Sequence, residues 1–160
     1  MKVYLFILLA LFSVGAYSSD EKQILASLNK LQAEINDLGG SDHFVSTVIG
    51  KIQTDECRSL IELVDKESPF AGDLEYFYAK CLYNSRQFGE ILSFEIGRFG
   101  FHPKKSGGSS ALIPVQTVLL KVKNGGKVLD RGIQIEFKPR KDHFTIYDME
   151  FIYGKAQLEP

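Results

Sequence analysis

The chain has 160 residues, with 19 basic and 20 acidic side chains and a formal net charge of −1. This length suits one domain with a hydrophobic core. The near balance of charge argues against a general role in nucleic-acid binding, because such domains carry a clear excess of basic residues. We therefore expect no nucleic acid among the partners.

The first 18 residues have the three parts of a secretory signal peptide. Lys2 gives the positive start, and residues 4–12 are apolar. The small residues Val14 and Ala16 suit cleavage after position 16, and Ala16 and Ser18 suit cleavage after position 18. A membrane anchor is the alternative, but the apolar run is shorter than the ~20 residues that span a bilayer. No later run reaches that length. We therefore expect a signal peptide at 1–18, a secreted protein and no transmembrane segment.

Residues 19–40 predict an amino-terminal helix. Ser18 and Glu21 stand in the capping-box relation, and Gly39 and Gly40 end the pattern. Apolar side chains recur at the heptad spacing of 4, 3, 4 and 3, at Ile24, Leu28, Leu31, Ile35 and Leu38. Because two heptads are few for a free coiled coil, we favour a helix that lies on its own domain. The alternative interpretation is the seam of a homodimer.

Three further helices are expected before residue 86. The first covers residues 42–52, the second begins after a Thr54 cap and carries Cys57, and the third begins after an Asp73 cap and carries Cys81. Both cysteines fall on apolar helix faces. A lone pair of cysteines in an oxidising compartment usually joins, and no C-x-x-C redox spacing is present. The sequence therefore predicts a structural disulfide between Cys57 and Cys81, with free thiols as the alternative.

The period changes to two after residue 85 and predicts four strands, over residues 88–101, 112–123, 128–138 and 144–153. Residues 102–110 are expected to form a loop, and Asn124 with two glycines a tight turn. A change of phase between Ile146 and Met149 predicts a bulge near 147–148. Pro114 suits a strand edge or a strand start. Helices followed by an antiparallel meander make an α+β domain.

This order of elements, together with the strand sequences at 132–137 and 144–151, resembles the nuclear-transport-factor-like superfamily. The resemblance implies a cone-like α+β domain over residues 41–160, in which amino-terminal helices pack on a four-stranded curved antiparallel sheet. The helix at 19–40 is an addition to the usual pattern. A cone of this kind implies a mouth that holds a small apolar ligand or a protein segment, and the superfamily contains both enzymes and domains without activity.

Aromatic side chains are the richest class of candidate binding residues. They recur on the last helix and on the strands, where they would form either a filled core or an aromatic lining beneath the sheet. The ordinary interpretation is the core. The candidate ligand-binding residues are Tyr76, Tyr78, Phe94, Phe137, Phe151 and Tyr153.

The titratable residues give weaker signals. The three histidines lack metal-ligand spacing, so we expect no metal and no cofactor. Asp148 and Glu150 share one strand face, and Glu95 could meet Glu136 across the sheet; such acids can act in catalysis but more often form an exposed face. We therefore expect a secreted, non-enzymatic binding domain for a small apolar ligand or an extracellular protein partner. The alternatives are a homodimeric interaction protein and an enzyme that uses the strand carboxylates.

Overall fold

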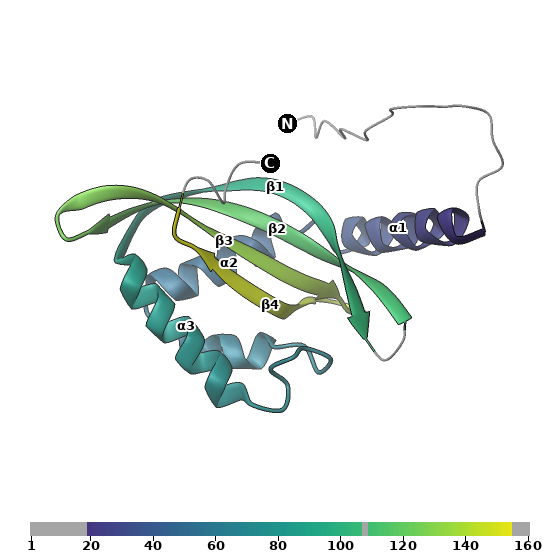
Figure 1. Cartoon of the computed structure of the whole chain (residues 1–160), viewed down its shortest axis with the longest axis horizontal. Helices are drawn as coiled ribbons and strands as arrows, with labels where there is room; N and C mark the ends of the chain where they lie inside the picture. Colours follow the sequence, from purple (N-terminus) through teal and green to yellow (C-terminus); the bar gives the residue numbers. More distant parts are fainter. Residues whose placement is uncertain (1–18, 107–108, 155–160) are drawn as a thin grey trace.

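The computed structural model describes residues 19–106 and 109–154. The signal peptide expected at 1–18 lies outside the described residues. Helices come first in the chain and four strands follow, which confirms the α+β class (Figure 1). The elements are α1 (Ser19–Asp37), α2 (Asp42–Gln53), the 3-10 helix η1 (Cys57–Leu63), α3 (Leu74–Phe88), β1 (Glu90–Ser106), β2 (Ser109–Asn124), β3 (Lys127–Pro139) and β4 (Phe144–Ile152).

The four strands form an antiparallel meander in the order β1-β2-β3-β4. The sheet is curved, and α3 and η1 lie beneath it (Figure 1). Its inner face is apolar, because Val118 pairs with Ile133 and Ile135 pairs with Met149. These four side chains are buried, as are Val48 and Ile49 of α2. The core therefore lies between the inner face of the sheet and the helices, as the period-two pattern predicts.

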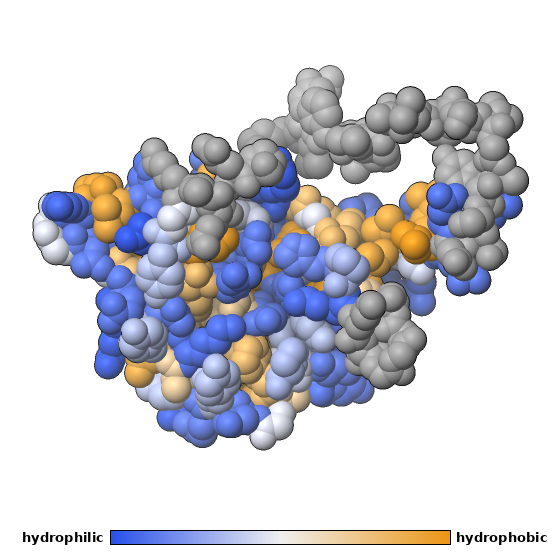
Figure 2. Space-filling view, in the orientation of Figure 1, coloured by the Kyte–Doolittle hydropathy of each residue, from blue (hydrophilic) through white to orange (hydrophobic). Residues whose placement is uncertain are grey.

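The amino-terminal helix lies on its own domain only in its second half. Ile35 is 3% exposed, and Leu31 and Leu38 pack partly against the core. Ile24 and Leu25, in contrast, are 53% and 56% exposed. The first turns of α1 thus project beyond the sheet with their apolar side chains uncovered (Figures 1 and 2).

The helix predicted after Thr54 begins later than expected and is a 3-10 helix. Thr54 does not cap it; Thr54 ends α2, and its hydroxyl donates to the carbonyl of Gly50 at 3.1 Å. Asp55 follows with a positive φ of 60°, which turns the chain before η1 begins. Asp73 caps α3 as predicted, because its Oδ1 accepts a hydrogen bond from the Tyr76 amide at 2.9 Å.

The loop predicted at 102–110 was wrong over most of its length. Strand β1 continues to Ser106, with His102 opposite Ile113 and Lys104 opposite Ala111. The glycines and Pro103 indicated a loop, but pairing within a long two-stranded hairpin overrides that local preference. Strand β3 pairs with β2 only from Val115 onward. Pro114 therefore lies where β2 has one neighbour, which agrees with the predicted edge position.

The predicted bulge in β4 falls at Tyr147. Glu136 pairs with Asp148 and Phe137 with Ile146, so Tyr147 has no partner on β3. The bulge also receives the segment after η1: the Ser68 hydroxyl donates to the Tyr147 carbonyl at 2.6 Å. Val64 forms a parallel bridge to Ile146. The outer edge of β4 is thereby covered at this point.

The junction between α3 and β1 requires glycine. Gly89 has φ of 89°, and a Cβ atom there would lie 2.4 Å from the carbonyl oxygen of Lys123. Because both the dihedral and the close approach exclude a side chain, this position brings the start of β1 against the end of β2. Asn124 reinforces the contact by donating to the Gln87 carbonyl at 2.6 Å.

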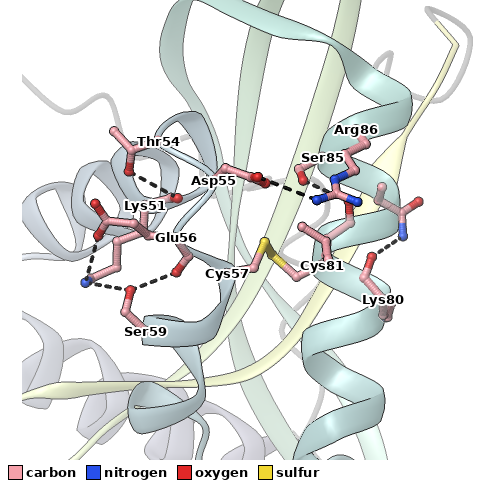
Figure 3. Close-up of a disulfide and its surroundings, with 12 residues drawn as sticks. Lys51, Thr54, Asp55, Glu56, Cys57, Ser59, Lys80, Cys81, Ser85 and Arg86 are labelled. Carbon is pink, nitrogen blue, oxygen red and sulfur yellow. Dashed lines mark hydrogen bonds and ion pairs between the residues drawn. A yellow bond between two sulfur atoms is a disulfide. The ribbon is translucent and has the colours of Figure 1, made fainter.

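Cys57 and Cys81 form a disulfide, as predicted, and their Cα atoms are 5.9 Å apart. The bond joins η1 to α3, and an ion pair between Arg86 and Asp55 at 3.9 Å lies beside it (Figure 3). Both cysteines are buried. A disulfide of this kind is typical of an oxidising compartment. In the part of the chain that the structure describes, no helix is long and apolar enough to cross a membrane.

Candidate ligand-binding site

The ring contacts of the six predicted aromatic residues fall into separate groups. Phe137 is fully buried in the core. Phe151 and Tyr153 both contact Phe88, with ring centroids 5.2 Å and 4.8 Å from it. Their role in ligand binding stays a prediction.

The other three predicted aromatics lie nearer the surface. Tyr76 stacks on Phe70 at 5.9 Å, Tyr78 lies 4.1 Å below the guanidinium of Arg58, and Phe94 on β1 is 38% exposed. The structure therefore brings Phe151 and Tyr153 together but does not bring all six residues around one centre.

Phe137 belongs to a cluster of rings under the curved sheet. Its ring centroid is 5.9 Å from Phe44, 6.3 Å from Phe99 and 5.3 Å from Phe144. Aromatic pairs at these separations contact each other directly. The space beneath the sheet at this point is therefore occupied by side chains, and the question becomes where the cluster reaches the surface.

The cluster reaches the surface through Phe44 and Phe144, whose ring centroids are 5.5 Å apart. Their rings face a hollow of about 310 Å³ at the end of the domain. We call this the amino-terminal hollow. It is lined by Leu38, Gly40, His43, Phe44, Thr47, Leu63, Asp142, His143 and Phe144.

Four parts of the chain build the amino-terminal hollow. They are the segment after α1, the first turns of α2, the last residue of η1, and the turn between β3 and β4 together with the first residue of β4. Gly39 and Gly40 both have positive φ, of 82° and 85°, which lets the chain reverse sharply from α1 into α2. This reversal places Leu38 and Phe44 on the same wall. The hollow is therefore fixed by the backbone path as well as by the side chains.

The polar groups lie at the rim of the hollow. Thr47 donates to the His43 carbonyl at 2.9 Å, and Asp142 Oδ1 lies 2.6 Å from Nδ1 of His143. The hydrogen bond with His143, and then its charge, hold the pKa of Asp142 below its ordinary value. An apolar floor with a few polar groups at its edge is the usual form of a site for a small organic molecule.

The sequence did not indicate this hollow. Phe44 and Phe144 are far apart in the chain, and each reads as an ordinary core residue of its own element. The detectable signals were the two glycines after the first helix and the paired Asp142 and His143 before the last strand. Neither signal says which apolar residues would meet there.

The strand carboxylates form a second group, on the outer face of the sheet. Glu136 lies opposite Asp148, whereas Glu95 lies opposite Leu119 on β2. The expected meeting of Glu95 with Glu136 was therefore wrong, because the long hairpin register carries Glu95 toward the other end of the sheet. Lys80 of α3 binds Asp148, with Nζ 3.2 Å from Oδ1.

Glu136 has two partners that the sequence did not predict. Its Oε1 lies 2.8 Å from Nδ1 of His102 and 3.0 Å from Nζ of Lys104. Both partners come from the segment of β1 that was expected to be a loop. Burial would lower the pKa of Lys104, but the hydrogen bond and charge of Glu136 outweigh it and raise the pKa.

A buried ion pair holds the segment after η1 against the sheet. Asp65 is 1% exposed, and Arg140 donates to both its oxygens, from Nε at 2.7 Å and from the terminal nitrogen at 2.5 Å. Thr145 and the amide of Glu67 donate as well. Burial would raise the pKa of Asp65, but the hydrogen bonds from Arg140 and Thr145 lead the effects that lower it to about 2. The fully bonded carboxylate indicates a structural role.

Among residues 19–106 and 109–154, no group of three or more His, Cys, Asp or Glu side chains could hold a metal ion. Comparison with protein-family models, with curated proteins and with solved structures finds no significant match to this chain.

Proposed function

We propose that this chain is a secreted, non-enzymatic binding domain and that the amino-terminal hollow holds a small apolar ligand. The observation that carries the proposal is the open floor formed by Phe44 and Phe144, with polar groups only at its rim. A volume of about 310 Å³ lies at the lower end of the range for small-molecule sites. The ligand would therefore be compact, apolar and able to accept or donate one or two hydrogen bonds.

The proposal that the protein acts outside the cytosol has two supports. The predicted signal peptide is one, and the Cys57–Cys81 disulfide is the other. The resemblance to nuclear-transport-factor-like domains rests on the observed order of helices and strands. In this proposal the ligand enters at the end of the sheet near α1, where the chain differs from the usual pattern by its additional helix.

Blocking the hollow tests the proposal. We expect the neutral apolar dye Nile red to bind the mature protein, with a saturable rise in fluorescence. Replacing Thr47 by Phe fills the rim and should weaken dye binding by about tenfold or more. Thr54→Phe is the matched control, because Thr54 directly follows α2, is exposed and, like Thr47, donates its hydroxyl to the carbonyl four residues earlier. Equal dye affinity in the two variants would refute the hollow as the site.

A second candidate function is self-association through α1. Its support is the uncovered pair Ile24 and Leu25, each more than half exposed on a helix whose other end packs on the domain. Light scattering should then show a dimer that Ile24→Lys converts to a monomer. Gln23→Lys, at a neighbouring exposed position, should leave the dimer intact. A monomeric mature protein at high concentration would exclude this function.

A further inference from the structure

The outer face of the sheet carries a polar hollow that is separate from the amino-terminal hollow. It has a volume of about 50 Å³ and is lined by Lys104, Gln134, Glu136, Asp148 and Glu150. The strand register brings these residues together, because Glu136 pairs with Asp148 and Gln134 pairs with Glu150. Directly opposite residues have Cβ atoms about 5 Å apart, and residues two apart on one strand share a face, so the four side chains lie close together.

Glu136 is the residue that points to a ligand. Its side chain is 9% exposed, and its Oε1 is bonded to His102 and Lys104. Its Oε2 is buried and accepts no hydrogen bond from any residue that the structure describes. Because a buried carboxylate oxygen without a donor is costly, a donor group in the hollow would stabilise it.

The charges around the polar hollow on the outer face favour binding of a cation with a single charge. Lys104 compensates Glu136, and Lys80 compensates Asp148. Glu150 is exposed and pairs with no cation in the described part of the chain. In the formal count, which takes histidine as neutral, one negative charge thus remains uncompensated. The lining also offers several oxygen acceptors, from Glu136, Asp148, Glu150 and the Gln134 amide, but one cationic donor.

The geometry favours an ammonium group over the other cations of this charge. A metal ion needs several converging ligands, and no three such side chains in the described ranges are placed to hold one. A guanidinium pairs best with both oxygens of one carboxylate, which the buried Glu136 cannot offer because its Oε1 is already bonded. An ammonium is compact and donates three hydrogen bonds in different directions, which suits acceptors on two strands.

We propose that this outer-face hollow binds a protonated primary amine, with Oε2 of Glu136 and the carboxylate of Glu150 as its main acceptors. Lys104 and His102 hold Glu136 in place through its other oxygen. The site is independent of the amino-terminal hollow, so either proposal can fail without the other. The amine would be a free small molecule or the lysine side chain of a partner protein, since both present the same group.

The test is a titration of the ¹⁵N-labelled mature protein with methylammonium chloride, followed through the amide resonances of residues 134–136 and 148–150. Tetramethylammonium chloride at equal ionic strength is the control, because it carries the same charge and has no N–H donor. We expect saturable shifts with methylammonium alone. Nα-acetyllysine amide distinguishes the two sources: binding of this probe identifies a lysine side chain, and its exclusion identifies a free small amine.

Two substitutions complete the test. Glu136→Gln should weaken methylammonium binding by about tenfold, since it removes a charged acceptor. Glu150→Gln should weaken it by about threefold, as for an exposed charge. Glu95→Gln is the matched control, because Glu95 is an exposed acid on β1 that lies outside the hollow. Equal shifts with the two cations would overturn the proposal. If Glu136→Gln does not fold, unchanged binding in Glu150→Gln would also overturn it.

Discussion

Asp65, which lies beside the sheet, and Glu136 of β3 both carry buried carboxylates, but their surroundings differ. Asp65 accepts hydrogen bonds on both oxygens, from Arg140, Thr145 and the Glu67 amide. Glu136 is bonded through one oxygen, and the other faces a small polar hollow. The two residues show how a protein uses the same group differently. A carboxylate with every lone pair satisfied fixes the fold, and one with an open acceptor is available for a ligand.

The largest expected effect follows from removing the cation that holds Asp65. Arg140→Ala leaves a buried charge without its main partner and should lower the free energy of unfolding by about 3–5 kcal/mol. Urea denaturation monitored by circular dichroism measures it. Glu67→Ala is the control, because Glu67 also contacts Arg140 but has a half-exposed side chain. It should cost less than about 1 kcal/mol. Similar losses of stability in the two variants would contradict the structural role that we assign to the Asp65 carboxylate.

The disulfide gives the next effect, because it also fixes η1, which leads directly to Asp65. The Cys57–Cys81 bond closes a loop with a sequence separation of 24. Replacing both cysteines by serine should lower the free energy of unfolding by about 3 kcal/mol. If the double variant instead loses no stability, the ion pair at Asp65 would suffice to hold this segment. Reduction of the wild-type protein under native conditions provides an independent measurement.

Acid should weaken the site of Asp65 by a predictable amount. Its folded-state pKa of about 2 lies below the ordinary 3.8, so the unfolded chain takes up the proton first. The stabilisation is therefore fully present above about pH 5 and is lost as the pH falls toward 2; it amounts to about 2 kcal/mol. Denaturation curves recorded between pH 7 and pH 2 measure this loss. Asp65→Asn should have a flatter profile, and an unchanged slope in that variant would assign the acid sensitivity to other groups.

The sequence predicted the helices and strands more accurately than the contacts between them. The capped start of α3 and the bulge at Tyr147 follow from local patterns, because a cap and a change of phase involve neighbouring residues. The disulfide followed from having two cysteines on apolar stripes. The 3-10 form of η1 was missed, since its apolar spacing over seven residues does not distinguish the two helix types.

The sites depend on residues that are distant in the chain, and this is why the sequence did not show them. Asp65 and Arg140 are 75 residues apart, and His102 and Glu136 are 34 apart. His102 and Lys104 were assigned to a loop because of Pro103 and the following glycines. Their contacts with Glu136 could therefore not be predicted. Pairing of two strands decides such contacts, and the register becomes known only when both strands are placed.

The smallest expected change in the free energy of unfolding is at Glu136, and it tests most directly whether Glu136 and Asp65 have different roles. Glu136→Gln removes a buried charge whose partners, His102 and Lys104, are partly exposed to water. The amide can also donate to the acceptors of Asp148 and Gln134 that line the same hollow. The free energy of unfolding should therefore change by less than about 1 kcal/mol in either direction. The same urea measurement checks it. A loss as large as that of Arg140→Ala would place Glu136 beside Asp65 as a structural carboxylate, and its open oxygen would then need another explanation.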